Sequence, residues 1–417
     1  MRVCVLGAGV IGLASAYYLA RDGHQVTLVD RNGAAGQECS YANGGQLSYS
    51  YVSPLAAPGV FAHLPEWLWR ADSPLRLRPR LDLWQWQWAI RFLAACTRSR
   101  NLTSTAELFR LAHLSRGLLH ELVEREDIAF DYSRTGKLIV YRDQAAFRSA
   151  MRHADHLATL GASQRILDGE GCVRLEPALA GMRAGIVGGV FTDSEEAGDC
   201  LRFCVELERI LRGRYHVDMR FHHAAEALQQ AKGKAAAVLT DRGPVEADLF
   251  VIALGVESAE IARRAGIALP LCGLKGYSLT LPAPGNAAPG ISVTDYQSRI
   301  VYARLGEALR IAAMVDIGGR GRAVEPDRVA ALKQRVRESF PGIRGLDEAR
   351  TWAGLRPATA QGKPVISNTP VSNLVVNVGH GALGFTLACG AGRLVADIVS
   401  GRSSPVSRDP FRLGTVH

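Results

Sequence analysis

An arginine stands among apolar residues in the segment 352–357 (WAGLRP), near the C-terminal end of the chain. A guanidinium in such a setting needs an anionic partner, and a carboxylate fits its planar fork of N–H donors. Arg356 therefore predicts one of two arrangements: a contact with the carboxylate of a small substrate, or a fixed internal ion pair.

A histidine lies in the segment 379–384 (GHGALG), where an expected strand over 374–378 passes into an expected helix over 385–400. Backbone N–H groups at such a junction can stabilise negative charge on a bound cofactor. The His380 side chain is a candidate catalytic group, although a structural hydrogen bond would explain it equally well. The candidate cofactor contacts at this junction are Gly379, Gly381, Ala382, Leu383 and Gly384.

The first 30 residues have the pattern of a dinucleotide-binding fold. Residues 2–6 read as a buried strand, 7–12 are GAGVIG, 13–21 have helical character, and 25–29 form a second apolar strand that ends at Asp30. The helix N-terminus offers unpaired N–H groups to a pyrophosphate. Asp30 can accept hydrogen bonds from ribose hydroxyls, which argues against a 2′-phosphate at that position.

Each glycine of the GAGVIG turn has a predicted task. Gly7 allows the tight turn, Gly9 lets the backbone approach the pyrophosphate, and Gly12 lets the helix pack closely on the strand. The pattern alone does not separate FAD from NAD. Further cofactor contacts are expected from Val10, Ile11, Arg31 and Gly255, the last of which ends a third buried strand over 248–254.

The segment 39–46 (CSYANGGQ) is rich in glycine and small residues and is too polar for a core element. It suits close contact with a flat ring, where larger side chains would block the approach. The alternative is a plain surface loop. The candidate cofactor contacts here are Ser40, Ala42, Asn43, Gly44, Gly45 and Gln46.

Five of the six tryptophans gather within residues 61–92, beside several arginines. Indoles favour the headgroup level of a bilayer and arginine is attracted to anionic lipid, so this stretch predicts a peripheral membrane contact. Packing between domains is the alternative. The residues concerned are Trp67, Trp69, Trp84, Trp86 and Trp88, with Arg70, Arg76, Arg78 and Arg80.

The composition of the 417 residues narrows the remaining possibilities. The formal charge is +9, but the basic residues are dispersed and no nucleic-acid recognition module is visible, so we expect no nucleic-acid partner. Eight cysteines without a CxxC pair fit a reducing cytoplasm, and no metal-binding motif appears. Because no run of 18 apolar residues or signal peptide is evident, we expect a cytoplasmic protein, with possible contact at the inner face of the cytoplasmic membrane.

The order of expected elements predicts an α/β fold with a discontinuous nucleotide domain. Strand patterns near residues 277–281, 300–304 and 309–314 predict a second domain with a largely antiparallel sheet. We predict a Rossmann-like FAD- or NAD-binding domain from 1–60, 190–270 and 350–417, and a substrate domain from 61–189 and 271–349.

Across nearly its whole length the chain resembles a family of FAD-dependent amino acid oxidases and dehydrogenases. This is the DAO family, which includes glycine oxidase, D-amino acid oxidase, sarcosine oxidase and the small subunit of D-amino acid dehydrogenase. The segments that carry the resemblance are 7–12 (GAGVIG), 40–46 (SYANGGQ), 56–59 (AAPG), 198–200 (GDC), 274–280 (LKGYSLT), 352–357 (WAGLRP) and 379–390 (GHGALGFTLACG).

The resemblance implies bound FAD and oxidative deamination of D-amino acids to 2-oxo acids and ammonia. It implies that Arg356 clamps the substrate carboxylate, with help from a tyrosine, for which Tyr302 and Tyr277 are the candidates, and with Ser48 and Tyr49 near the substrate. It leaves open whether the electron acceptor is a quinone or oxygen, and D-proline or hydroxy-D-proline is an alternative substrate. A non-catalytic nucleotide-binding subunit is the alternative from another class.

Overall fold

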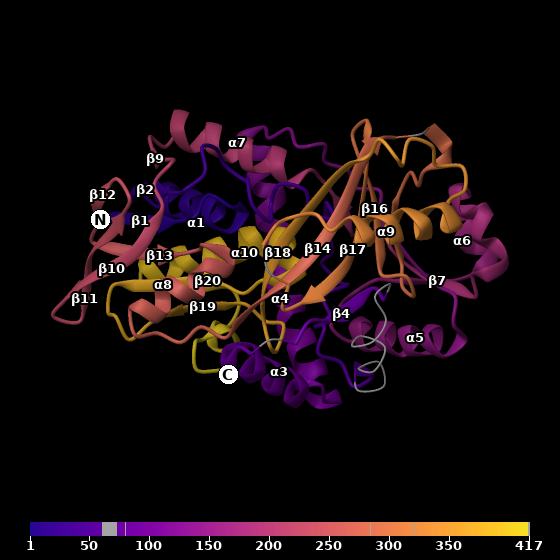
Figure 1. Cartoon of the computed structure of the whole chain (residues 1–417), viewed down its shortest axis with the longest axis horizontal. Helices are drawn as coiled ribbons and strands as arrows, with labels where there is room; N and C mark the ends of the chain where they lie inside the picture. The colour runs from indigo at the N-terminus through magenta and orange to yellow at the C-terminus, as the bar shows by residue number, and fades with distance from the viewer. Residues whose placement is uncertain (61–72, 80, 284, 320, 416–417) are drawn as a thin grey trace.

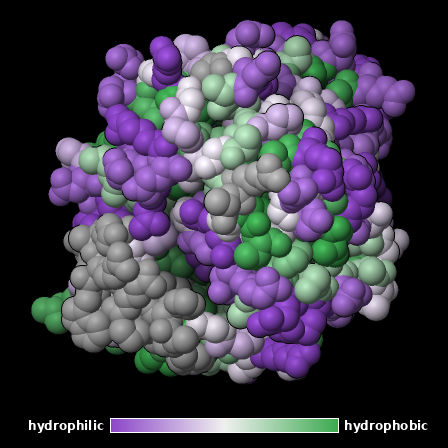
Figure 2. Space-filling model, turned by 90° about the vertical axis from the view of Figure 1, so that its right-hand side faces the viewer, coloured by the Kyte–Doolittle hydropathy of each residue, from purple (hydrophilic) through white to green (hydrophobic). Residues whose placement is uncertain are grey.

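A computed structural model describes residues 1–60, 73–79, 81–283, 285–319 and 321–415, although not the side chains of residues 183 and 184. The structure is organised around two large sheets, which lie side by side along the longest axis of the molecule (Figure 1). At the end of the molecule where α6 (Gly169–Leu175) lies, hydrophilic side chains cover most of the surface around more limited hydrophobic patches (Figure 2).

The six-stranded sheet is parallel except for one edge strand, as expected for a Rossmann-like fold. Its order is β19 (Val365–Asn368), β20 (Leu374–Val378), β13 (Leu249–Ile252), β1 (Arg2–Leu6), β2 (Gln25–Val29) and β9 (Asp218–Arg220). β19 is the antiparallel strand. Because these strands come from widely separated parts of the chain, the sheet is discontinuous in sequence.

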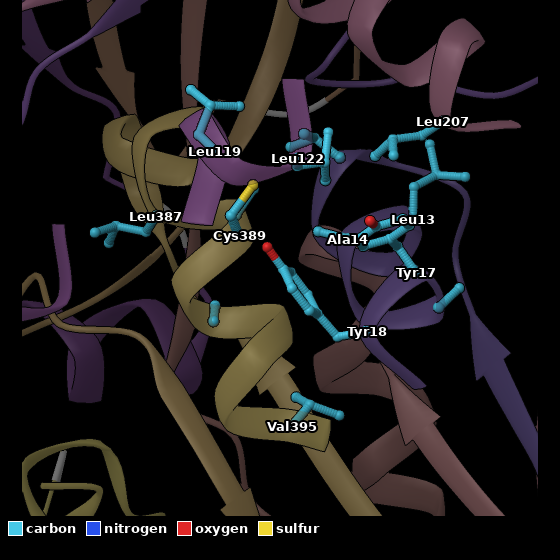
Figure 3. Close-up of a cluster of buried hydrophobic side chains, with 14 of the residues drawn as sticks. Leu13, Ala14, Tyr17, Tyr18, Leu119, Leu122, Leu207, Leu387, Cys389 and Val395 are labelled. Carbon is cyan, nitrogen blue, oxygen red and sulfur yellow. The ribbon is translucent and has the colours of Figure 1, made fainter. Parts of the chain in front are cut away.

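Helices cover one face of this sheet. They are α1 (Val10–Arg21), α4 (Arg98–Glu126), α7 (Cys200–Gly213) and α10 (Gly384–Val399), and their apolar side chains form one buried cluster (Figure 3). The other face packs against α8 (Ser258–Arg264) and a small antiparallel sheet of β10 (Ala225–Ala231), β11 (Lys234–Thr240) and β12 (Gly243–Glu246).

Helix α10 lies at the centre of the first cluster. By length and composition, residues Gly381–Val399 could cross a membrane, but 67% of the apolar window is buried in the protein. A Cβ atom at Gly392 would lie 2.7 Å from the backbone of Ala14 in α1, and Gly390 donates its N–H to Ser115 of α4 at 3.1 Å. α10 is therefore packed as the core helix of a globular domain.

The nine-stranded sheet is largely antiparallel, as the sequence predicted for the substrate domain. Its order is β18 (Arg350–Thr359), β14 (Leu271–Pro282), β17 (Ala308–Ile317), β16 (Ile300–Leu305), β15 (Ser292–Asp295), β5 (Lys137–Tyr141), β7 (Gly188–Thr192) and β6 (Arg165–Asp168), with β4 (Leu75–Leu77) beside β17. Strand pairs β15–β5 and β17–β4 are parallel. One face packs against α9 (Pro326–Ser339).

The predicted boundary at residue 350 is wrong. Strand β18 pairs along ten residues with β14 and so belongs to the nine-stranded sheet, although the sequence predicts it in the nucleotide-binding domain. The chain returns to the six-stranded sheet only at β19. The physical reason is that the residues of a strand do not by themselves decide which sheet it joins; its long-range partner, here β14, decides this.

The remaining elements connect or flank the two sheets. Helix α4 begins at Arg98, earlier than the apolar periodicity from residue 106 indicates, because the side chain of Thr97 caps it by accepting the Arg100 N–H. The other elements are β3 (Gln46–Leu47), β8 (Glu196–Ala197), α3 (Leu83–Ala95), α5 (Gln144–Ala158), and the 3-10 helices η1 (Pro177–Gly185), η2 (Gly255–Glu257), η3 (Gly285–Ala287), η4 (Gly381–Leu383) and η5 (Asp409–Phe411).

Candidate active site

A cavity of about 910 Å³ runs from the carboxyl ends of the parallel strands to the face of the nine-stranded sheet. It brings together almost all of the predicted site residues, which come from distant parts of the sequence. Those in its wall are Gly7, Gly9, Val10, Ile11, Asp30, Arg31, Ser40, Ala42, Asn43, Gly44, Gly45, Gln46, Ser48, Gly255, Tyr277, Arg356, Gly379, His380, Gly381, Ala382, Leu383 and Gly384.

The turn between β1 and α1 has the close backbone packing expected of a dinucleotide site. A Cβ atom at Gly12 would lie 1.8 Å from the carbonyl oxygen of Gly7, so Gly12 packs inside the turn and does not line the cavity. Gly7 has φ +110° and lies against the backbone of Ala253. At Gly9 a Cβ atom would meet only Ser40 Oγ, at 3.6 Å, which leaves the backbone open to the cavity.

Asp30 braces this turn and also faces the cavity. Its Oδ2 accepts the N–H of Ala8 at 2.7 Å, and its Oδ1 accepts the N–H of Asn32 at 2.8 Å. Burial raises the pKa of the Asp30 carboxyl, and these hydrogen bonds act in the opposite direction. The carboxylate therefore fixes the shape of the loop at the ribose end of the cavity.

Four alternating charges close the same end of the cavity. Arg31 pairs with Glu38 and Glu257, both at 2.8 Å, and Arg322 pairs with Glu38 at 2.6 Å and with Glu257 at 2.9 Å. Arg322 follows β17, so the ring ties the nine-stranded sheet to the loops of the six-stranded sheet. The predicted cofactor contact Arg31 thus lies in the wall with its guanidinium held by two carboxylates.

The glycine-rich segment after β2 lies along the nine-stranded sheet instead of forming a plain surface loop. Ser278 Oγ donates to the carbonyl of Ala42 at 2.7 Å, and Arg310 Nη1 donates to the carbonyl of Asn43 at 2.8 Å. A Cβ atom at Gly44 would lie 3.5 Å from Ala312 and Val301. The backbone therefore forms a flat wall of the cavity, which fits the contact with a planar ring.

These features together fit FAD. The open backbone at Gly9 and the N-terminus of α1 would hold the pyrophosphate, Asp30 the ribose, and the segment 42–46 the ring system. The N-terminus of α10, with the η4 turn before it, points its positive dipole end at the same cavity.

Arg356 is the cation at the other end of the cavity. Its guanidinium packs over Gly276, where a Cβ atom would lie 2.4 Å from Cζ, and its Nη1 donates to the carbonyl of Met314 at 3.4 Å. Among the described residues no carboxylate oxygen lies within 4 Å of it, and burial lowers its pKa, with only the Cys39 thiol acting the other way. The sequence predicts for Arg356 either a contact with a substrate carboxylate or a fixed internal ion pair. Among the described residues Arg356 forms no such ion pair.

The two tyrosines predicted to help Arg356 bind the substrate do not lie beside it. Tyr302 pairs with Ile311 on the face of the sheet that packs against α9, and its ring lies 4.7 Å from that of Phe340, so its predicted substrate contact is wrong. Tyr277 belongs to the same apolar cluster; it reaches the cavity wall, but its hydroxyl donates to Asp316 at 3.0 Å. Side chains alternate between the two faces of a sheet along each strand. Both tyrosine rings therefore lie on the other face of the sheet from Arg356.

Tyr49 also lies outside the cavity wall. Its hydroxyl donates to the buried carboxylate of Glu196 at 2.7 Å, and His120 contacts the same carboxylate at 2.6 Å. The prediction that Tyr49 binds substrate is therefore wrong. Ser48, its neighbour, faces the opposite way and does line the cavity.

His380 is buried in the cavity wall, with only 3% of its surface exposed. Burial lowers the pKa of its imidazole to about 3, so the side chain is neutral at physiological pH. Within the described residues its Nε2 has no hydrogen-bond partner. This arrangement fits a neutral group placed beside a bound ring and argues against an imidazolium acid.

Sequence reasoning did not single out three further residues of the cavity wall: Lys137, Tyr51 and Arg299. Lys137 is buried and donates to Ser48 Oγ at 2.9 Å, with its Nζ 4.4 Å from the centre of the Tyr51 ring. A lysine that opens an otherwise apolar strand (137–141, KLIVY) is the feature that could have revealed it.

Comparison with known proteins gives the family. The model of the family described as "FAD dependent oxidoreductase" (DAO) matches residues 2–398. The chain is 46% identical to "D-amino acid dehydrogenase 2" of Ralstonia nicotianae, covering 99% of this chain and 100% of that protein. It is 49% identical to "D-amino acid dehydrogenase 2" of Pseudomonas aeruginosa, covering 97% and 96% respectively.

Solved structures share the fold. Glycine oxidase from Geobacillus kaustophilus matches with a TM-score of 0.78 at 21% identity, covering 99% of this chain and 98% of that one. L-proline dehydrogenase from P. horikoshii also matches with a TM-score of 0.78, at 14% identity, covering 99% and 96%. The family model and the full-length relatives show that this chain belongs to the FAD-dependent oxidoreductase (DAO) family, and the cavity described above fits that membership.

Proposed function

We propose that this protein is an FAD-dependent D-amino acid dehydrogenase that converts D-amino acids to 2-oxo acids and ammonia. The observation that carries the proposal is Arg356, a partly buried guanidinium that lines the cofactor cavity without a carboxylate partner among the described residues. The names of the relatives that match the full chain support the same substrate class.

Arg356 binds the α-carboxylate of the substrate through two of its N–H groups. Its position against Gly276 and the Met314 carbonyl fixes the guanidinium, so that the substrate's Cα–H is held toward the cofactor. Met314, Leu355 and Trp352 line the cavity beside it and limit the access of water to the reacting carbon. When bound, FAD supplies the redox chemistry by accepting a hydride from Cα.

The substrate reacts as the neutral amine, whose lone pair assists loss of the hydride and leaves an imine that water hydrolyses. No side-chain base is required for this step. His380, which is neutral, and the N-terminal end of α10 line the cavity, where they would stabilise negative charge on bound FAD.

The test of this function is anaerobic reduction of the purified, flavin-loaded protein. We expect D-alanine to bleach the flavin absorbance and the L-enantiomer to leave it unchanged. Ammonia and pyruvate should form in equal amounts when an electron-accepting dye is added. Bleaching by neither enantiomer, or by L-alanine alone, would contradict the proposal.

The proposed electron acceptor is a quinone, reached by peripheral contact of the protein with a membrane. Helix α3 supports this part of the proposal, because it exposes apolar side chains on its surface: Leu83 by 72%, Trp84 by 49%, Trp86 by 47% and Ile90 by 66%. Arg98, just beyond the helix, is also exposed. Apolar and indole groups beside arginine suit the boundary between headgroups and acyl chains.

Only part of the tryptophan-rich stretch fits this role. Trp88 is buried and donates to the carbonyl of Ala358 at 3.0 Å, so its prediction as a membrane contact is wrong. Arg76 and Arg78 pair with Glu325, and Arg76 also pairs with Asp316. Their charges are therefore engaged inside the protein. The predictions for Trp67, Trp69, Arg70 and Arg80 concern residues outside the part of the chain that the structure describes.

The membrane proposal is tested on the exposed face of α3. We expect the Leu83→Ser/Ile90→Ser variant to lose binding to anionic vesicles and reduction of a quinone embedded in them, while it still reduces a soluble dye. Arg209→Gln, an exposed change on α7, is the control. Equal loss of both activities, or a wild-type protein that ignores vesicles and yields peroxide instead, would overturn the proposal.

A further inference from the structure

The charges that line the cavity are unevenly distributed. All five acidic residues of its wall, Asp30, Glu38, Glu226, Glu257 and Glu260, lie on or beside the elements of the dinucleotide end. Of the cations in the wall, Arg31, Arg264 and Arg322 pair with these carboxylates. The rest of the wall, formed by the nine-stranded sheet and the residues packed on it, contains no acidic residue and three cations: Arg356, Lys137 and Arg299. The α-carboxylate of the substrate engages only the first of these.

Lys137 and Arg299 each lie over one of two aromatic rings, Tyr51 and Tyr296, that pack in the same cluster. Lys137 Nζ lies 4.4 Å from the centre of the Tyr51 ring, and Tyr51 packs in one apolar cluster with Ile139 and Tyr296. Arg299 lies over Tyr296, with its Cζ 5.6 Å from the centre of that ring, and its positive charge lowers the pKa of the Tyr51 hydroxyl, against the effect of burial. The two cations therefore belong to one cluster in the cavity wall.

Neither cation has a direct carboxylate partner among the described residues. Lys137 donates to Ser48, and Glu195, which lies behind the wall, acts on it only from beyond ion-pair distance. Burial lowers the pKa of Lys137 to about 8, so the ammonium group is largely retained at pH 7. Arg299 is exposed toward solvent and the cavity. An anionic ligand group could therefore reach both.

The backbone places this cluster within reach of Arg356. Val301 of β16 pairs with Ala312 of β17, and both line the cavity together with Arg299, in the turn before β16, and Met314, whose carbonyl accepts from Arg356. Adjacent strands lie about 5 Å apart. Arg299 is, moreover, held at φ 51° in the turn before β16, a left-handed conformation that residues with a side chain seldom adopt.

We propose that Lys137, Tyr51 and Arg299 form a second anion-binding subsite that takes the side-chain carboxylate of an acidic D-amino acid, such as D-glutamate. This inference rests on the proposed function, in which Arg356 binds the α-carboxylate. The two ends of the substrate are then held by separate cations, and the reacting Cα–H lies between them. Lys137 and Arg299 act as specificity-determining residues and take no part in the hydride transfer.

The experiment compares D-glutamate with D-glutamine, which has nearly the same shape but no second charge. Rates of anaerobic flavin reduction give kcat/KM for each substrate in the wild type and in Arg299→Gln, with Lys137→Gln as a second variant and Arg209→Gln as the control. We expect the wild type to prefer D-glutamate. Each cavity variant should lower that preference about tenfold, since a hydrogen bond to a charged group is lost.

Three results would overturn the subsite. The first is a wild-type flavin that is reduced no faster by D-glutamate than by D-glutamine. The second is an equal loss of the rates with D-glutamate and D-glutamine in both cavity variants. The third is a control that shifts the preference as much as Arg299→Gln. Equal loss would mean that the cations act on the cofactor. D-alanine separates this failure from that of the proposed function, because it needs Arg356 alone and must still bleach the flavin.

Discussion

Arg356 donates a hydrogen bond to the backbone carbonyl of Met314, and Met314 is held at φ 60° in the middle of strand β17. The pairing of β14 with β17 shifts register here, so that Gly276 stands opposite an extra residue of β17. Such bulges re-aim groups beside functional sites. The strained backbone of Met314 is therefore part of what fixes the guanidinium.

The first prediction concerns the charge of this arginine. Arg356→Ala should lower kcat/KM for D-alanine, mainly through a higher KM, because a charge-assisted contact is lost. The loss of transition-state stabilisation should be about 2–5 kcal/mol. Arg356→Lys should recover only part of this, since an ammonium lacks the planar fork. Flavin content, measured by absorbance, should stay near the wild-type value in both. Unaltered kinetics in a flavin-loaded Arg356→Ala protein would refute the assignment.

Gly276 provides a test that leaves Arg356 itself in place. A Cβ atom at this position would lie 2.4 Å from the guanidinium carbon, so Gly276→Ala must displace the flexible end of Arg356. We expect KM for D-alanine to rise with little change in flavin content. Gly59→Ala, at a glycine where a Cβ atom would meet nothing within 4 Å, is the matched control. Wild-type KM in Gly276→Ala would show that the position of the guanidinium is not critical.

Asp30 should control cofactor retention. Asp30→Ala removes an acceptor for the ribose and also frees the N–H groups of Ala8 and Asn32, so we expect lower FAD occupancy after dialysis. Any flavin-loaded fraction should still be reduced by D-alanine at close to the normal rate, because Asp30 lies at the other end of the cavity from Arg356. Full occupancy in the variant would contradict the role of this carboxylate.

His380 predicts how stability depends on pH. The pKa of the buried imidazole is lowered to about 3, whereas the unfolded chain binds a proton near pH 6.5. Between these values the unfolded state holds more protons, so this residue makes the protein less stable as the pH falls from about 6.5 toward 3. Urea unfolding at several pH values should show a shallower decline for His380→Asn. An identical decline would mean that His380 does not contribute.

Two tryptophans of helix α3 should differ sharply in their effect on stability. Trp88 is 4% exposed and stacks on Phe92, so Trp88→Ala should cost about 3–5 kcal/mol in the free energy of unfolding. Trp84 is 49% exposed, so Trp84→Ala should change the free energy of unfolding by no more than about 0.5 kcal/mol. Denaturant titration followed by circular dichroism would measure both. Similar losses would place Trp84 inside the fold.

The sequence by itself was sufficient for the dinucleotide end of the site. The strand, the GAGVIG turn, the helix and Asp30 are contiguous, and their backbone geometry is set by local rules: Gly7 has φ +110°, and a Cβ atom at Gly12 would lie 1.8 Å from the Gly7 carbonyl oxygen. The resemblance to a known family added the identity of Arg356 as the substrate cation. Neither source of information required knowledge of long-range contacts.

The substrate end was decided by the tertiary structure. Whether Arg356 has an internal carboxylate partner, and whether Tyr302, Tyr277 or Tyr49 faces the cavity, depends on strand register and on the bulge opposite Gly276. A shift of one residue moves a side chain to the other face of a sheet. Lys137 in β5 and Arg299 in the turn before β16 meet at the Tyr51–Tyr296 cluster only when β5 and β16 join the same sheet. Residues so far apart in sequence share a site only through long-range strand pairing.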